Sequence, residues 1–267
     1  MSRKQFFRFS YHVPRKKGRP SLPHQLRDGD AALELSEVLR AQGYEYGEVI
    51  LNYPAEDETV SITVDDTFLT SSDLLLLTTR PPLDDEHERP RKAVHRSHTT
   101  LELKVFAALR QFFKWCDRSQ IILAEQLVPT LPPAAVRKSN ILFRQHGGAA
   151  YERYTGPGDE WHKPPPDRRT TVAYLAYAEH AWEGGPALLA AFAVGGTETL
   201  VWAHLLRTRF PHLVCSVPFV MAEITTTKPP ARPHDLSFAD KWPVEILTDP
   251  VEAERSSSRR PLQRRGR

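Results

Sequence analysis

The residues best suited to chemistry surround a pair of glycines late in the chain. Gly195 and Gly196 follow an apolar run, and Thr197 and Glu198 then open a helix-like pattern that stops at Pro211. A helix that begins at such a turn offers unsatisfied backbone amides and a partial positive charge, which attract phosphate or carboxylate groups. We therefore predict that the amides of Gly196 and Thr197 donate to a small anion.

The same turn also fits a purely structural corner between a strand and a helix. The stretch GGTETL has neither the glycine spacing of a dinucleotide-binding turn nor the lysine of a P-loop. Glu198 would lie in the first helical turn, where its carboxylate complements the helix dipole and repels an incoming anion. Glycine suits a tight turn for backbone reasons alone. The corner and the anion site both stay open as interpretations.

A long stretch rich in glycine and proline, residues 146–169, carries further candidates for a site. It contains Trp161 and His162 and ends in Arg168 and Arg169. Long loops inside compact domains are often lids or binding loops, and a disordered insertion is the alternative interpretation of this stretch. We expect the two arginines to pair with an anion and Trp161 to stack on it or close over it. In a catalytic version of the site, Glu198 or His162 would act as acid or base.

Strand pairing is what should bring these candidates together. The strand-like stretches TTVAYLAYAEH and ALLAAFAV are separated only by the connector AWEGGP, which favours antiparallel pairing. The beginning of the first stretch, next to Arg168 and Arg169, would then lie beside the glycine turn. The helix after that turn and the stretch LVCSVPFVMAEI complete a β-α-β unit over residues 187–224.

The opposite turn offers a weaker candidate for a metal site. Glu179, His180 and Glu183 lie within a few residues of one another. Histidine and carboxylates in this arrangement could hold a metal or transfer protons. The chain has no HExxH motif, no pair of CxxC motifs and no clear third ligand. A polar hairpin turn is the favoured interpretation, so we predict no metal and no cofactor.

Charge is distributed unevenly along the 267 residues. Residues 1–27 contain eight basic residues and no acidic one, and residues 255–267 contain six basic residues and no acidic one. Fourteen of the 36 basic residues therefore lie at the two ends, and 22 remain against 33 acidic residues between them. Basic ends could bind nucleic acid, but an acidic body argues against a broad nucleic-acid footprint.

Hydrophobic patterning predicts a mixed α/β fold, with a mixed parallel and antiparallel sheet and flanking helices. One helix is expected from Asp30, its N-cap, to Gly43, and another from the capping-box pair Thr99 and Glu102 through Cys116. Two lobes are an alternative to a single body. The boundaries would then be a lobe over 1–80, a charged, proline-rich linker over 81–93, a second lobe over 94–250, and a basic disordered tail over 251–267.

These observations predict an accessory or binding protein that receives a small anionic molecule or a peptide segment. The site would lie at the edge formed by the loop, Arg168, Arg169 and the glycine turn. The alternatives are an enzyme that uses the same pocket and a nucleic-acid-associated protein that acts through its basic ends. A further protein partner is possible. No apolar run approaches the roughly 20 residues that span a bilayer, so we expect a cytoplasmic protein without membrane contact.

Overall fold

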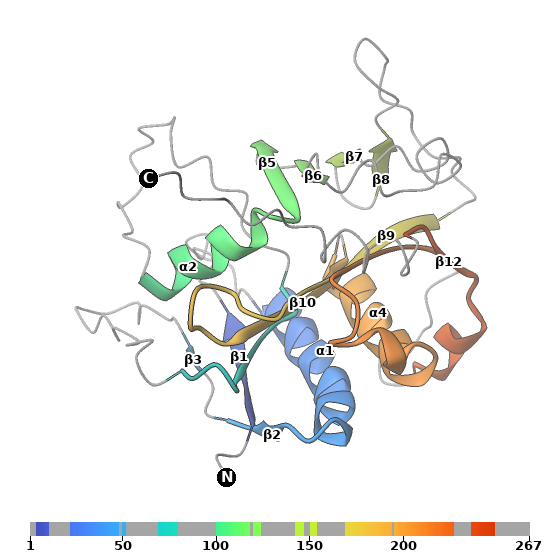
Figure 1. Ribbon diagram of the computed structural model, residues 1–267. Coiled ribbons are helices and arrows are strands. Elements are labelled where there is room, and N and C mark those ends of the chain that lie inside the picture. Colours follow the sequence, from blue (N-terminus) through green and yellow to red (C-terminus); the bar gives the residue numbers. More distant parts are fainter. Residues whose placement is uncertain are drawn as a thin grey trace.

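The main sheet is the centre of the molecule and has helices on both faces (Figure 1). The structure, a computed structural model, describes residues 4–10, 22–47, 50–51, 69–79, 100–117, 120–123, 142–146, 150–153, 169–193, 195–226 and 236–248. Parallel and antiparallel strands occur in the same sheet, so the fold is α/β with a mixed sheet, as the sequence predicts.

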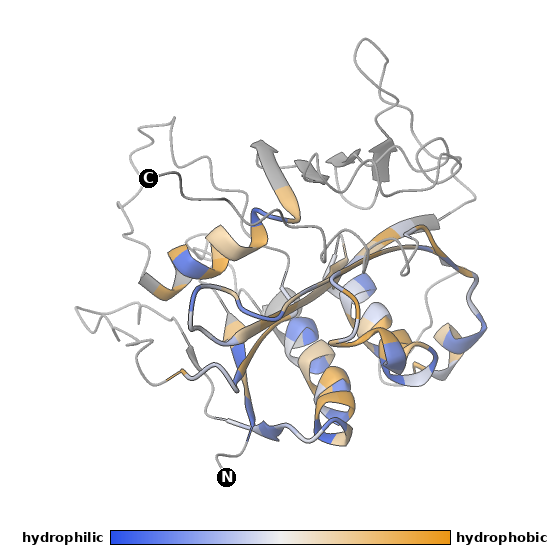
Figure 2. Cartoon of the chain, in the orientation of Figure 1, coloured by the Kyte–Doolittle hydropathy of each residue, from blue (hydrophilic) through white to orange (hydrophobic). Residues whose placement is uncertain are grey.

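Eight strands form this sheet in the order β12-β11-β9-β10-β4-β1-β2, and β3 also pairs with β1. The strands are β1 (Gln5–Ser10), β2 (Glu45–Tyr46), β3 (Ile50–Leu51), β4 (Leu74–Leu77), β9 (Arg169–Ala178), β10 (Ala187–Ala193), β11 (Phe219–Thr226) and β12 (Val244–Ile246). β1, β4 and β10 are parallel, whereas β9 is antiparallel to both β10 and β11. The central strands β4 and β10 contain only hydrophobic residues, orange in Figure 2, because both of their faces are covered.

The predicted β-α-β unit is confirmed, with one strand inserted between its two strands. After β10 the chain forms helix α4 (Gly196–Thr208) and the short 3-10 helix η3 (Pro211–Leu213), and returns as β11. β10 and β11 are each antiparallel to β9, so they point the same way. Helix α4 therefore crosses over β9 on its way from β10 to β11.

Two apolar cores lie on the two faces of the sheet. Helix α1 (Leu22–Ala41) and α4 cover one face, and α2 (Thr100–Leu109) covers the other (Figure 1). Alternate residues of β9 serve the two cores, as the pleat of a strand requires. Ala173 and Leu175 pack with α1 and α4, whereas Tyr174 and Ala176 pack with α2.

Helix α1 begins at Leu22, so the prediction of Asp30 as its N-cap is wrong. Pro23 suits the first helical turn, where a missing backbone amide costs little. Gly29 lies within the helix, where a Cβ atom would be 3.1 Å from Nη1 of Arg8. The predicted end is confirmed, because Gly43 follows the helix with a left-handed φ of +89°.

Helix α2 begins at Thr100, close to the predicted start, but it ends at Leu109, before Cys116. Residues Phe113–Asp117 form strand β5 instead of continuing the helix. The ring of Phe113 packs against two other rings, with centroid distances of 5.5 Å to Tyr174 and 5.4 Å to Phe192. Aromatic residues in this stretch favour a strand. Phe113 is buried in the apolar core on the α2 side of the main sheet.

A second sheet has the strand order β5-β6-β7-β8, with every neighbouring pair antiparallel. Its other strands are β6 (Gln120–Leu123), β7 (Leu142–His146) and β8 (Ala150–Arg153). Strand β8 falls within the stretch 146–169 that was expected to be a loop, and His146 pairs with Ala150 across β7 and β8. That stretch therefore begins with regular structure.

Strands from both sides of residues 81–93 share the main sheet, because β4 pairs with β10. Residues 81–93 and 251–267 lie outside the described residues, so the linker, the tail and the division into two lobes stay predictions. None of the helices in the described residues combines the length and the apolar composition that a membrane span requires.

Candidate functional site

The carboxyl ends of two strands and the amino end of β9 meet at one edge of the main sheet. Ala193 at the end of β10 pairs with Ala173, and Thr225 near the end of β11 pairs with Thr170. Helix α4 begins at this edge, directly after β10. Strand ends of this kind commonly bind ligands in α/β proteins.

The first turn of α4 presents backbone amides that the helix itself does not use. Gly195 is the N-cap in an extended conformation, with φ of −132° and ψ of 164°, and no side chain caps the helix. The amide of Thr199 donates to the carbonyl oxygen of Gly195 at 2.8 Å, which is the first helical hydrogen bond. By helix geometry, the amides of Gly196, Thr197 and Glu198 have no intrahelical acceptor.

The carboxylate of Glu198 lies over this turn. A Cβ atom on Gly195 would be 2.5 Å from Oε2 of Glu198, so glycine is what permits the close approach. Glu198 is the third helical residue, the position from which an acidic side chain commonly folds back toward the N-cap. Its negative charge also complements the positive end of the helix dipole.

Thr171 on β9 has an unsatisfied hydroxyl group. The residue is 3% exposed, and its Oγ1 is the only buried side-chain nitrogen or oxygen without a hydrogen-bond partner among the described residues. It pairs across the sheet with Ile224, which is fully buried. A buried hydroxyl without a partner costs about 1–3 kcal/mol.

Measured along the direction of β9, Thr171 and Gly196, the first residue of α4, lie at about the same height. The indole Nε1 of Trp202 donates to the carbonyl oxygen of Tyr174 at 3.0 Å, which fixes α4 over β9. From Trp202 back to Gly196 the helix covers about 9 Å. From Tyr174 back to Thr171 the strand, which runs in the same direction, covers about 10 Å. Residues 171, 173 and 175 alternate to the same face of the strand, and α4 covers Ala173 and Leu175, so the side chain of Thr171 lies on the α4 side of the sheet.

Thr199 lies at the same edge of the sheet, but its hydroxyl group, unlike that of Thr171, has a hydrogen-bond partner. Its buried Oγ1 accepts a hydrogen bond from the amide of Ala193 at 2.9 Å. This contact joins the end of β10 to the first turn of α4 and gives the last strand amide a partner. The sequence pattern predicted the turn but neither of these two threonine roles.

Several predicted site residues lie outside the described residues. They are Trp161, His162 and Arg168. The backbone of Arg169 is described and pairs with Thr226 at the start of β9. Pairing of the arginines with a ligand, closure by Trp161 and acid–base roles for His162 or Glu198 therefore stay predictions.

The weak metal candidates lie at the opposite edge, in the turn between β9 and β10. Glu179, His180 and Glu183 are all exposed, and Nδ1 of His180 lies 3.4 Å from the carbonyl oxygen of Gly185. Gly184 has a left-handed φ of +70°, as a tight turn requires. In the described ranges, no group of three or more His, Cys, Asp or Glu side chains could hold a metal ion.

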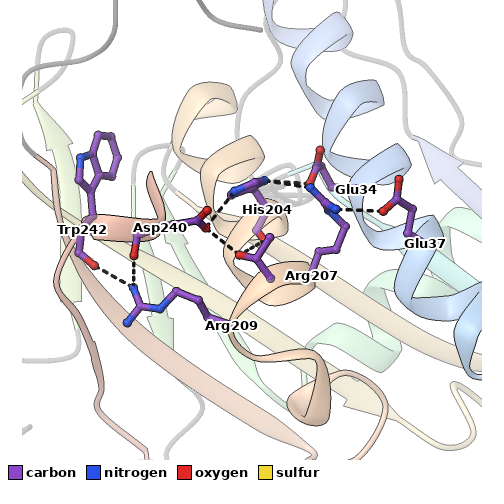
Figure 3. A network of polar contacts seen from close by, with 8 residues as sticks. Glu34, Glu37, His204, Arg207, Arg209, Asp240 and Trp242 are labelled. Atoms are coloured by element: carbon purple, nitrogen blue, oxygen red, sulfur yellow. Dashed lines mark hydrogen bonds and ion pairs between the residues drawn. The ribbon is translucent and has the colours of Figure 1, made fainter. Parts of the chain in front are cut away.

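A polar network that the sequence did not predict joins the other end of α4 to its surroundings (Figure 3). Its centre is His204, which is 5% exposed. Nδ1 of His204 lies 3.1 Å from Oε2 of Glu34 on α1, and Nε2 lies 3.1 Å from Oδ1 of Asp240 on the 3-10 helix η4 (Ser237–Lys241).

Two arginines extend this network along both sides of α4. Nε of Arg207 donates to the same oxygen of Glu34 at 2.7 Å, and Nη1 donates to Glu37 at 3.1 Å. The hydrogen bond to Glu34 raises the pKa of Arg207. On the other side, Nη1 of Arg209 donates to the carbonyl oxygen of Trp242 at 2.9 Å. The network thus ties α1, α4 and η4 together.

A signal for this network was present in the sequence. His204 interrupts the apolar run of α4 between Ala203 and Leu205, and a polar residue in a buried stripe needs partners. The partners themselves were not predictable, because Glu34 lies 170 residues away and Asp240 lies 36 residues away.

Cys215 lies beyond the end of α4 with a positive φ of 58°. Burial raises the pKa of its thiol to about 12, and the nearby ammonium of Lys4 only partly offsets this. Burial, together with Cys215 and Tyr44, also raises the pKa of Tyr177 to about 12. The thiol is therefore protonated near neutral pH and is a poor nucleophile.

No family model, curated protein or solved structure matches this chain. The assignment of a site therefore depends on the geometry around α4.

Proposed function

We propose that the protein is a binding protein that receives a small anionic molecule at the start of α4. The observation that carries this proposal is the buried hydroxyl of Thr171, which has no partner and lies at the level of Gly196. A ligand oxygen that accepts from this hydroxyl would remove the cost of leaving it unsatisfied. The adjacent amides of Gly196 and Thr197 would donate to the same anion.

Charge for the site would come from the residues that precede Thr171. Arg168 and Arg169 are the nearest basic residues in the chain, and Arg169 begins β9. Arginine binds anionic oxygens through paired, charge-assisted hydrogen bonds. In this proposal the two arginines hold the outer oxygens of the ligand, and Trp161 covers it.

The carboxylate of a peptide segment is the other form of ligand that these donors would accept. Cys215 is a free thiol, which suits a reducing compartment, so we place the protein in the cytoplasm as part of the proposal. The described residues add no support for the alternatives of an acid–base enzyme and of nucleic-acid binding through the chain ends.

Isothermal titration calorimetry with inorganic phosphate tests this proposal. The wild type is expected to bind phosphate with a dissociation constant in the millimolar range or below. The double variant Arg168→Ala/Arg169→Ala should bind at least about tenfold more weakly, because hydrogen bonds to charged groups contribute about 1.5–3 kcal/mol.

The exposed Arg40, in the last turn of α1, provides the control. The variant Arg40→Ala removes a positive charge at the opposite end of the sheet and should leave phosphate binding unchanged. Phosphate binding that is absent in the wild type, or equal in the wild type and the double arginine variant, would contradict the proposal.

A further inference from the structure

The buried ring of His204 has different surroundings at its two nitrogen atoms (Figure 3). Nε2 lies 3.1 Å from Oδ1 of Asp240, which also accepts a hydrogen bond from Oγ1 of Thr208 at 2.9 Å. Nδ1 lies 3.1 Å from an acceptor, Oε2 of Glu34, and 3.4 Å from a donor, Nη2 of Arg207. Among the described residues, Nε2 therefore faces only an acceptor, whereas Nδ1 has a partner for either role.

These surroundings give the two protonation states of the ring different hydrogen bonds. A neutral ring that donates to Asp240 through Nε2 leaves Nδ1 as an acceptor for Nη2 of Arg207. Nδ1 and the carboxylate of Glu34 are then two acceptors in contact, with no hydrogen between them. A protonated ring also donates to Asp240, and its Nδ1 becomes a donor to Glu34.

The charged groups near the ring come from three helices. They are Glu34 and Glu37 on α1, Arg207 and Arg209 at the end of α4, and Asp240 and Lys241 on η4. Helix η3 adds the exposed His212. On the sheet below, burial raises the pKa of Tyr177 to about 12, so Tyr177 is uncharged. Of these side chains, only Glu34, Arg207 and Asp240 make polar contacts with the ring within the described part of the chain.

We propose that His204 is a pH-dependent switch that strengthens the attachment of α1 to α4 as the pH falls. Protonation changes the partner of Nδ1 from Arg207 to Glu34, while Nε of Arg207 keeps its hydrogen bond to Glu34 at 2.7 Å. The switch lies at the opposite end of α4 from the proposed anion site and does not depend on anion binding.

The direction of the pH effect follows from the contact with Glu34. In the folded protein this carboxylate stabilises the proton on Nδ1, whereas the unfolded chain holds no carboxylate beside the ring. The folded state therefore takes up the proton more readily than the unfolded state. Stability from this contact is present at low pH and is lost as the pH rises through the range in which histidine ordinarily titrates.

Long-range ¹H–¹⁵N correlation spectra of the histidine rings test the change of partner directly. The His204 ring should carry hydrogen on Nε2 alone at about pH 8 and on both nitrogens at about pH 5.5. The variant His204→Gln identifies its signals. A neutral ring with hydrogen on Nδ1 would overturn the proposal, and so would a ring that keeps one protonation state at both pH values.

Urea denaturation at the same two pH values tests the effect on stability. The ratio of the folding equilibrium constants at low and high pH should be about fivefold larger in the wild type than in His204→Gln, because a charge-assisted hydrogen bond is about twice as strong as a neutral one. Glu34→Gln keeps the size of the side chain and removes its charge, so this variant should lose the same pH effect. His212→Gln, at an exposed histidine outside the network, should keep it.

Each outcome of the denaturation experiment decides the proposal. An equal pH effect in the wild type and in Glu34→Gln would contradict it. Loss of the effect in His212→Gln would also contradict it, because the effect would then belong to another histidine. If His204→Gln does not fold, the comparison of Glu34→Gln with His212→Gln decides, since the side chain of Glu34 is partly exposed.

Discussion

The two ends of helix α4 differ in whether their buried polar groups have partners. At the carboxyl end, both ring nitrogens of His204 have carboxylate partners, and Arg207 supports one of them (Figure 3). At the amino end, the helix has no side-chain cap and the buried hydroxyl of Thr171 has no partner. A satisfied network stabilises the fold, whereas an unsatisfied buried group lowers stability and suggests a site that a ligand completes.

Removing the centre of the satisfied network should have the largest effect. His204→Ala removes the buried ring that joins the carboxylates of Glu34 and Asp240, so we expect a loss of about 2–3 kcal/mol in the free energy of unfolding. Urea denaturation measures this loss. The exposed His180→Ala should change stability by less than about 0.5 kcal/mol. Equal effects of the two substitutions would mean that the network contributes nothing.

Thr199→Val should have the next largest effect. It removes the hydroxyl that accepts from the amide of Ala193 and leaves a buried donor without a partner. We expect a loss of about 1–2 kcal/mol, again measured by urea denaturation. A stability equal to the wild type would show that this hydrogen bond does not hold the strand end to the helix.

Thr171→Val should have a smaller effect of opposite sign. Valine has nearly the same shape as threonine and no hydroxyl to leave unsatisfied, so the free energy of unfolding should rise by about 1 kcal/mol. The same variant should bind inorganic phosphate more weakly in calorimetry. A stability loss like that of Thr199→Val would show that the Thr171 hydroxyl has a structural partner.

Arg209→Ala should have the smallest effect. It removes the hydrogen bond to the carbonyl oxygen of Trp242, but the side chain is on the surface and water can replace it. We expect a loss of about 0.5 kcal/mol and faster amide hydrogen exchange in residues 236–248. Unchanged exchange in that segment would show that Arg209 does not help to hold η4 in place.

Local patterns in the sequence predicted the features that short segments determine. The brief connector after β9 gave the antiparallel pairing, Gly43 marked the end of α1, and the glycine turn marked the start of α4. Long-range packing decided what was missed. Phe113 packs in the core on the α2 side of the main sheet, and the chain there forms β5 where the sequence predicts a longer α2. Strand β8 pairs with β7 and so occupies part of the expected loop.

The candidate site was predictable only in its backbone. The order of β9, β10 and α4 brings the start of β9 beside the glycine turn, which follows from the short connector. The unsatisfied hydroxyl of Thr171 and the position of the Glu198 carboxylate depend on how α4 is seated on the sheet. The contact between Trp202 and Tyr174 sets that position, and nothing in the local sequence predicts it.

A titration of ¹⁵N-labelled protein with inorganic phosphate, followed by the amide resonances in NMR, tests the central claim most directly. The claim predicts saturable shifts of the amides of Gly196 and Thr197, with little change at His204 and Arg207. It also predicts that Thr171→Val reduces the shifts and weakens the fitted affinity. Shifts that do not saturate, or that appear at the His204 end of α4 instead, would contradict the assignment of the site to the start of the helix.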